Sequence, residues 1–308
     1  MSRKIVVSTL QLPQKTEGES AEEKKRGNLK AIVENLTVAG ERGSDVSVFG
    51  EMANLHGLPF KRESLAGYAD PVPGPFLDSI SEIAEEYSMN IIAPVIARIE
   101  GALRNAALVV DREGELVGSY LKTHLPAPEA EAGIVPGDEI PVFELDFGKV
   151  GIMICMDIEY PELPLCLMLE GAEIIFFPHV QSGWGEIDWE ARYRSRAIDT
   201  GTYLVSSSYG VGDDEPWRPG MMLGRSGIIG PDGMILAEAS RYVEVLTREI
   251  DLDRKRISNF HFARLCERST AVKASRRPEL YGILCDTDTV RESEARAQEI
   301  MKRLEDGN

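Results

Sequence analysis

The sequence has few cysteines and few histidines, which narrows the chemistry it can encode. The four cysteines of the 308-residue chain form no CxxC pair, so we expect reduced thiols rather than a disulfide framework. The four histidines show no HxxxH or HExxH spacing, so we expect no metal site, and no cofactor is indicated. These residues are Cys155, Cys166, Cys266, Cys285, His56, His124, His179 and His261.

Long hydrophobic runs and an excess of basic residues are also absent. No run is long enough to span a bilayer, and the amino-terminal MSRKIVVSTLQL lacks the apolar stretch and cleavage site of a signal peptide. Lys and Arg number 34 against 51 Asp and Glu, which gives a formal net charge of -17. Such a surface repels phosphate backbones and anionic lipid. We therefore expect a cytoplasmic protein that acts on a small molecule, with neither nucleic acid nor membrane as a partner.

What the chain does have is an alternation of short apolar runs with longer amphipathic stretches. With 43% hydrophobic residues it can bury a large core. Strands separated by helices and mixed with hairpins predict an α/β fold with mixed sheets. Strands are expected in 4–12, 45–50, 89–100, 102–122, 141–156, 172–179, 202–209 and 224–239, and helices in 22–42, 73–87, 161–171 and 189–201.

No linker or change of composition divides the first 285 residues, so we expect one domain over 1–285. Residues 286–308 are highly charged and carry only a narrow apolar stripe. A lone helix cannot bury so thin a stripe usefully. We expect this tail to dock on the body of the protein or on a second subunit.

Cys155 ends an apolar run, whereas the other cysteines have no comparable setting. An isolated cysteine there is more often a core residue. However, Asp157 follows within two residues and a helix is expected from Pro161, so we expect the thiol to lie at a strand-to-helix elbow near backbone N–H groups. This is a suitable place for a nucleophile.

Glu51 and Lys122 also follow directly on predicted strands. Each residue type is usually solvated and inert, but a carboxylate buried at the edge of a sheet can serve as a base near neutrality. Three strands then deliver a base, a cation and a thiol to what is expected to be one edge.

At these positions the chain resembles the nitrilase superfamily of carbon–nitrogen hydrolases. GEMANLHG around Glu51, YLKTHLP around Lys122 and GIMICMDIEYPE around Cys155 resemble its three catalytic blocks, in the family's order. The resemblance extends over roughly Lys4 to Tyr281. It implies a four-layer α-β-β-α sandwich, a Glu-Lys-Cys triad and a homodimer or larger homo-oligomer.

The sequence departs from this family's pattern before the base, and it leaves a second glutamate ambiguous. Gly50 stands where the family usually has proline. The family's second glutamate, which positions substrate, corresponds to Glu129 or Glu131. We favour Glu131 because of its distance from the following Pro-Gly.

The resemblance also implies a reaction. Glu51 takes the proton of Cys155, the thiolate attacks a carbonyl carbon, and Lys122 with the Met156 N–H holds the oxyanion, leaving a thioester. Nitrilases of the family tend to have Trp-Glu after the cysteine, whereas Met156-Asp157 resembles its amide-cleaving members. Hydrolysis of a small amide or N-carbamoyl compound is therefore favoured. A nitrilase, an acyltransferase and a non-catalytic binding protein remain alternatives.

Further along, FFPHVQSGWGE is expected to form part of the pocket wall. His179 and Trp184 are candidates for substrate selection, although a buried histidine and a packing tryptophan are equally common. Three arginines on the next helix are candidates for binding a substrate carboxylate, although such arginines usually pair with neighbouring acids. They are Arg192, Arg194 and Arg196.

Overall fold

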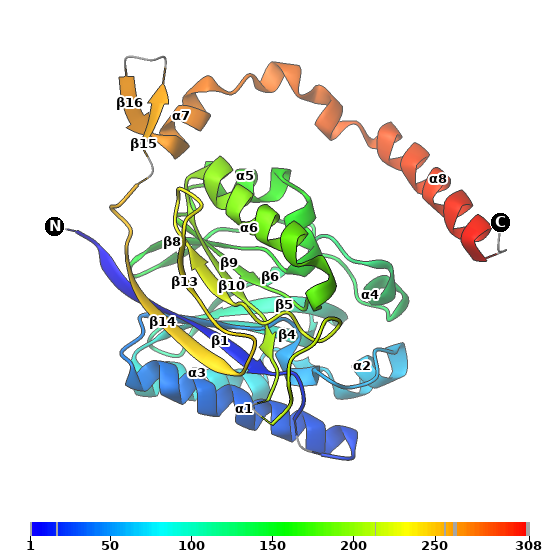
Figure 1. The fold of residues 1–308 in the computed structure, drawn as a ribbon. Helices are drawn as coiled ribbons and strands as arrows, with labels where there is room; N and C mark the ends of the chain where they lie inside the picture. Colours follow the sequence, from blue (N-terminus) through cyan, green and yellow to red (C-terminus); the bar gives the residue numbers. More distant parts are fainter. Residues whose placement is uncertain (1, 17, 213, 256, 261–263, 306–308) are drawn as a thin grey trace. The chain divides into compact units, whose positions relative to one another are not determined.

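The computed structural model describes residues 2–16, 18–212, 214–255, 257–260 and 264–305 (Figure 1). The chain divides into two compact units, Met1–Ser269 and Thr270–Asn308. The second unit contains a long helix over most of the charged tail. The domain boundary at residue 285 and the docking of the tail remain predictions. Of the apolar stripe on the tail, the side chains of Ile300, Met301 and Leu304 lie outside the described residues.

The first sheet is mixed and is built around the amino-terminal strand. Its strands are β1 (Lys4–Pro13), β2 (Val46–Phe49), β3 (Asp70–Pro71), β4 (Asn90–Ile99), β5 (Ala102–Val110), β6 (Leu116–Leu121), β11 (Tyr209–Gly210) and β14 (Glu244–Asp251). Their order is β11-β1-β2-β4-β5-β6, with β14 beside β1 and β3 beside β4. β1, β2 and β4 are parallel, whereas β5 and β6 continue as antiparallel hairpins.

The second sheet carries the strand that leads to Cys155. Its strands are β7 (Phe143–Leu145), β8 (Gly148–Ile152), β9 (Ile174–Pro178), β10 (Tyr203–Ser207), β12 (Gly227–Ile229) and β13 (Ile235–Glu238). They run in the order β13-β12-β10-β9-β8-β7, and the central three are parallel. A separate hairpin pairs β15 (Ile257–Phe260) with β16 (Arg264–Glu267).

The helices begin and end largely where the sequence predicts. α1 starts with a capping box, in which the Ser20 side chain accepts from Glu23 N and the Glu23 carboxylate accepts from Ser20 N. Within the described residues, no helix is long and apolar enough to cross a membrane. The helices are α1 (Ala21–Glu41), α2 (Arg62–Tyr68), α3 (Pro75–Tyr87), α4 (Ala127–Glu131), α5 (Glu162–Leu169), α6 (Glu186–Thr200), α7 (Arg268–Ser275) and α8 (Thr287–Glu305), with single-turn helices η1 (Ala53–Leu55), η2 (Cys155–Glu159), η3 (Gly183–Gly185), η4 (Pro278–Leu280) and η5 (Gly282–Cys285).

Three apolar cores make the first unit a four-layer α-β-β-α sandwich, as predicted. α1 and α3 cover the outer face of the first sheet, and α5 and α6 cover that of the second (Figure 1). A third core lies between the two sheets. Because the central strands are buried on both faces, their sequences are predominantly apolar, and those of β4 and β9 are nearly continuous apolar runs. The core between the sheets includes Val7, Val48, Ile92, Ile152, Phe176 and Val205.

Candidate active site

Three of the sequence-predicted groups do meet at one end of the sandwich. Glu51 comes two residues after β2 and Lys122 directly follows β6, and both are 1% exposed. Lys122 Nζ donates to Glu51 Oε1 at 2.8 Å and also to Glu129 Oε1, which is 4% exposed. One ammonium thus serves two buried carboxylates.

Cys155 lies on a tight turn that follows β8. It is the first residue of η2 and has φ 48°, a left-handed conformation that is strained for a residue with a Cβ. Asp157 closes the turn, because its carboxylate accepts from Ile154 N at 2.8 Å and its own N–H donates to Ile154 O at 3.1 Å. The predicted elbow is confirmed, although β8 already ends at Ile152.

The backbone of Val180 joins the thiol to the carboxylate. The Cys155 thiol donates to Val180 O at 3.6 Å, and Val180 N donates to Glu51 Oε2 at 3.1 Å. Val180 comes two residues after β9, so strands of both sheets supply the site.

Asp157 connects the segment after Lys122 to the Cys155 elbow. Besides Ile154 N, its carboxylate accepts from Tyr120 Oη at 2.6 Å and from Thr123 Oγ1 and His124 N at 3.1 Å each. Asp157 therefore supports the elbow through hydrogen bonds to the backbone.

Of the two candidate glutamates, the structure brings Glu129, and not the favoured Glu131, to Lys122. Both residues lie on α4, where positions two apart point to nearly opposite sides of the helix, so only one can face inward. Glu129 is buried against Lys122, whereas Glu131 is exposed. The distance in sequence to the following Pro-Gly does not indicate which side of α4 a residue faces. That side decides whether Glu129 or Glu131 reaches Lys122.

Burial and charge set the protonation of the site. Burial raises the pKa of the Cys155 thiol well above its ordinary value, and the charge of Glu51 raises it further, with Lys122 opposing. Burial alone would lower the pKa of Lys122, but the charges around it, Glu51 foremost, raise it above its ordinary value. Burial and then the charge of Glu51 raise the pKa of Glu129. At rest the site therefore holds a protonated thiol beside a permanent ammonium.

The Tyr209 ring leaves no room for a side chain at position 50, which accounts for the glycine there. A Cβ at this position would lie 2.7 Å from Tyr209 Cε2, so neither proline nor any other residue with a Cβ fits without moving the ring. Tyr209 Oη donates to Glu51 O at 2.6 Å, and the ring stacks on His56 at 3.8 Å. Tyr209 therefore holds the backbone next to the proposed base.

Gly50→Ala is expected to lower the free energy of unfolding by about 1–3 kcal/mol, because the new methyl group overpacks against Tyr209. Urea unfolding measures the loss. Gly67→Ala is the matched control, since no neighbouring atom of the described residues lies within 4 Å of a Cβ there and Gly67 lies within α2. Equal stability of the two variants would contradict this account.

The other predicted site residues lie in different surroundings. His179 is buried and stacks on Phe177 and Trp189 at 4.7 and 5.1 Å. Burial lowers its pKa to about 3, so its ring is neutral near physiological pH. Trp184 is 79% exposed. Met156 is half-buried in the first turn of η2, next to the thiol.

The arginines of α6 are paired within the protein. Arg192 donates to Asp188, and Arg196 donates to the Ile158 carbonyl at 2.9 Å. Arg194 donates to Glu190 at 3.0 Å. The contacts of these three arginines therefore favour pairing within the protein over binding of a substrate carboxylate.

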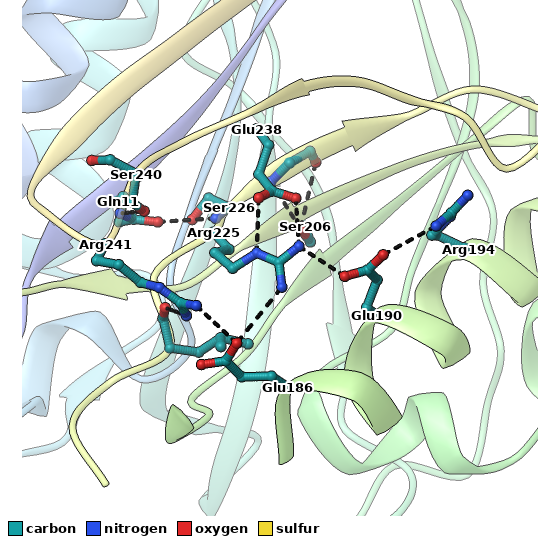
Figure 2. Close-up of polar contacts among 12 residues, drawn as sticks. Gln11, Glu186, Glu190, Arg194, Ser206, Arg225, Ser226, Glu238, Ser240 and Arg241 are labelled. Carbon is teal, nitrogen blue, oxygen red and sulfur yellow. Dashed lines mark hydrogen bonds and ion pairs between the residues drawn. The ribbon is translucent and has the colours of Figure 1, made fainter. Parts of the chain in front are cut away.

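Arg225 joins α6 to the β12–β13 hairpin (Figure 2). Its guanidinium donates to both Glu238 oxygens at 2.8 and 3.0 Å and to Glu190 at 2.8 Å. Arg241 donates to Glu186, the first residue of α6, at 2.8 Å and lies 4.3 Å over the Trp217 ring. These ion pairs fix the start of α6, which follows the loop that carries Val180.

Sequence reasoning missed three contributors to the site. They are Asn105 of β5, which donates to both carboxylates, Tyr209 and the Val180 backbone. A polar residue within the apolar run RNAALVV was the available signal for Asn105. Backbone groups such as those of Val180 leave no signal in the side-chain pattern.

The fold and these contacts define a sandwich enzyme with a cysteine at a strand-end elbow and a buried Glu-Lys pair. Among the described residues, no group of three or more His, Cys, Asp or Glu could hold a metal ion. Residues 6–256 match the family model described as carbon-nitrogen hydrolase. The chain belongs to this family.

Individual relatives agree with this assignment. The omega-amidase NIT2 of Xenopus tropicalis is 27% identical over 84% of this chain and 92% of its own length. A hydrolase in the pqqF 5' region of Pseudomonas protegens is 30% identical over 83% of this chain and 85% of its own. The crystal structure of a carbon-nitrogen hydrolase from Helicobacter pylori G27 is similar in fold, with a TM-score of 0.73 and 23% identity over 92% of this chain and 98% of that one.

Proposed function

We propose that this enzyme hydrolyses the C–N bond of a small amide or N-carbamoyl compound through a thioester on Cys155. The observation that carries the proposal is the buried Lys122–Glu51 ion pair, linked through Val180 to the thiol of the strained Cys155 turn. Omega-amidases among the relatives support an amide substrate.

The first half of the reaction follows from the protonation of the site. Because the resting thiol is protonated, Glu51 must remove its proton as Cys155 attacks the carbonyl carbon. Lys122 stays charged and, with the Met156 N–H, stabilises the oxyanion that develops. Glu51 then gives its proton to the departing ammonia or amine, and the thioester remains.

In the second half, the same carboxylate activates water. Glu51 takes a proton from a water molecule, which attacks the thioester carbon and releases the acid and the thiolate. The proton returns to Cys155. Glu129, fixed beside Lys122, positions the ammonium and the substrate throughout.

Three alternative functions differ from the amidase in the group that the thiol attacks, in the molecule that accepts the acyl group, or in having no reaction. A nitrilase would attack a nitrile carbon at the same thiol, and an acyltransferase would pass the thioester to an amine. A binding protein would leave Cys155 unreactive. The Met156-Asp157 pair and the omega-amidase relatives favour the amide.

A screen that measures ammonia release tests the proposal. We expect turnover with at least one class among small amides, ω-amides and N-carbamoyl amino acids. A matched nitrile is expected to react more slowly, and added amine is expected to leave the acid as the main product. Turnover of the nitrile alone would assign a nitrilase. No turnover, together with a Cys155 that resists iodoacetamide, would favour a binding protein.

Glu129→Gln is expected to lower kcat/KM by about 10²-fold, because the Lys122 ammonium loses an ionic partner that fixes its position. Glu131→Gln changes the same residue type on the same helix at an exposed position and is expected to leave kcat/KM unchanged. Steady-state kinetics on the best amide compare the two. A larger loss of kcat/KM in Glu131→Gln than in Glu129→Gln would instead favour Glu131 as the second glutamate of the site.

The setting of the enzyme is also a proposal. We infer a cytoplasmic location from the four free cysteines. We infer a homodimer or larger homo-oligomer, with the charged tail as a docking segment. Size-exclusion chromatography with light scattering, on the full chain and on a chain ending at residue 285, tests the assembly and the role of the tail.

A further inference from the structure

Two buried carboxylates share one ammonium in this site, so a further donor is needed to keep both in place. Glu51 and Glu129 both accept from Lys122 Nζ. Like charges in a buried site repel each other and favour uptake of a proton. The base must nevertheless be ionised and aimed at the thiol to act.

Asn105 supplies this donor. It is 1% exposed, and its Nδ2 donates to Glu51 Oε1 at 2.8 Å and to Glu129 Oε2 at 3.1 Å. A side-chain amide has two N–H donors. One carboxylate takes each, so the amide bridges the pair.

The backbone fixes this bridge in position. In the antiparallel register of β5 and β6, Ala106 pairs with Leu121, and Lys122 N donates to Asn105 O at 2.9 Å. Asn105 and Lys122 are therefore neighbours across two strands. The cation and the neutral donor reach the same two carboxylates from adjacent strands.

The oxygen of the Asn105 amide indicates that this position requires a hydrogen-bond donor. Asn105 Oδ1 is buried and has no hydrogen-bond partner among the described residues. Turning the amide over would bring that oxygen against two carboxylates, so the hydrogen-bond network fixes its orientation. A buried oxygen without a hydrogen-bond partner lowers the stability of the fold, so this orientation of Asn105 has a cost in stability.

We propose that Asn105 is a positioning residue. As a neutral double donor, it aims Glu51 at the Cys155 thiol and holds the Glu129 carboxylate in a separate position from that of Glu51. The proposal rests on the proposed role of Glu51 as the base of Cys155. The titratable groups around this bridge are Glu51, Lys122, Glu129, Cys155 and Tyr209, whose hydroxyl donates to Glu51 O.

The test is the pH dependence of Cys155 alkylation by iodoacetamide, followed on the Cys155 peptide by mass spectrometry. Asn105→Ala removes both donors, and Asn105→Asp replaces them with acceptors. Ionised carboxylates without these donors bind protons more readily, so the acid limb of the profile should move to higher pH. We expect a shift of about one pH unit, the size that loss of a hydrogen bond to a charged group implies. With an amide substrate, kcat should fall while KM changes little.

Asn90 offers a matched control on the same sheet. It is also 1% exposed, its Nδ2 donates to Asp45 O at 3.0 Å and to Asp146 Oδ1 at 2.9 Å, and its Oδ1 likewise has no partner in the part of the chain that the structure describes. Asn90→Ala and Asn90→Asp should lower the urea midpoint but leave the Cys155 profile unchanged. If Asn105→Asp does not fold, Asn105→Ser, which keeps one donor, gives the same comparison.

A folded Asn105→Ala variant with the wild-type alkylation profile would overturn the positioning role. This outcome is separate from failure of the proposed function, because alkylation needs no turnover. A shifted profile in a protein that hydrolyses no amide would leave the bridge in place and refute the amidase. A Glu51→Gln variant that keeps the wild-type profile would refute the base on which both rest.

Discussion

Cys155→Ala should lower turnover of the best amide by about 10⁴-fold or more, because covalent catalysis has no other nucleophile at the elbow. The substitution removes one sulfur and keeps a Cβ, so the strained turn with φ 48° is retained. The circular dichroism spectrum and the cooperativity of urea unfolding should therefore match those of the wild type. Ammonia release and single-turnover acylation provide the measurements.

Cys166→Ala is the matched control for this substitution. Cys166 is a free, partly buried cysteine on α5, close in sequence to the nucleophile. The Cys166→Ala variant should retain turnover within about twofold, since its sulfur has no part in acyl transfer. Wild-type activity in Cys155→Ala, or equal losses in the two variants, would refute the assignment of the nucleophile.

Lys122→Met should destabilise the fold as well as abolish turnover. The methionine has a similar volume but leaves two buried carboxylates without their shared cation, and breaking such a pair costs about 3–5 kcal/mol. Loss of the ammonium also removes the main group proposed to hold the oxyanion. Equilibrium urea unfolding and kcat measure the two effects separately.

The destabilisation should depend on pH in a defined direction. The pKa of Glu129 is already raised by burial and by the charge of Glu51, and Lys122 is one of the groups that oppose this rise. Removing the lysine raises that pKa further. A group with a raised folded-state pKa contributes stability below its unfolded value of 4.5, and this contribution is lost as the pH rises through the folded value. The deficit of Lys122→Met should therefore be larger at pH 8 than at pH 5.

Lys25→Met gives the comparison for an ion pair that is not fully buried. Lys25 donates to Asp70 at 2.7 Å, and its side chain is 31% exposed. Solvent screening limits such a pair to about 0–1 kcal/mol. A loss in Lys122→Met no greater than that in Lys25→Met, or one that grows toward acid pH, would contradict the electrostatic account of the site.

Local pattern was sufficient to predict most elements of the fold. The apolar runs of β4 and β9 are nearly continuous because these strands are covered on both faces, and α1 carries its own capping box. β14 was not predicted, because its burial is uneven along an exposed edge and its identity as a strand depends on pairing with β1. Long-range pairing of this kind leaves little local pattern.

By itself, the sequence determined which side chains end buried strands, and so it brought Glu51, Lys122 and Cys155 forward as candidates for one site. Strand direction and burial are encoded locally, in apolar periodicity and in the residues that interrupt it. Only the tertiary structure decided that Glu129 rather than Glu131 meets Lys122, that Asn105 bridges the two carboxylates, and that the Val180 backbone joins Glu51 to the thiol. These choices depend on helix phase, on strand register and on backbone groups from segments far apart in the chain, and no local pattern of side chains specifies them.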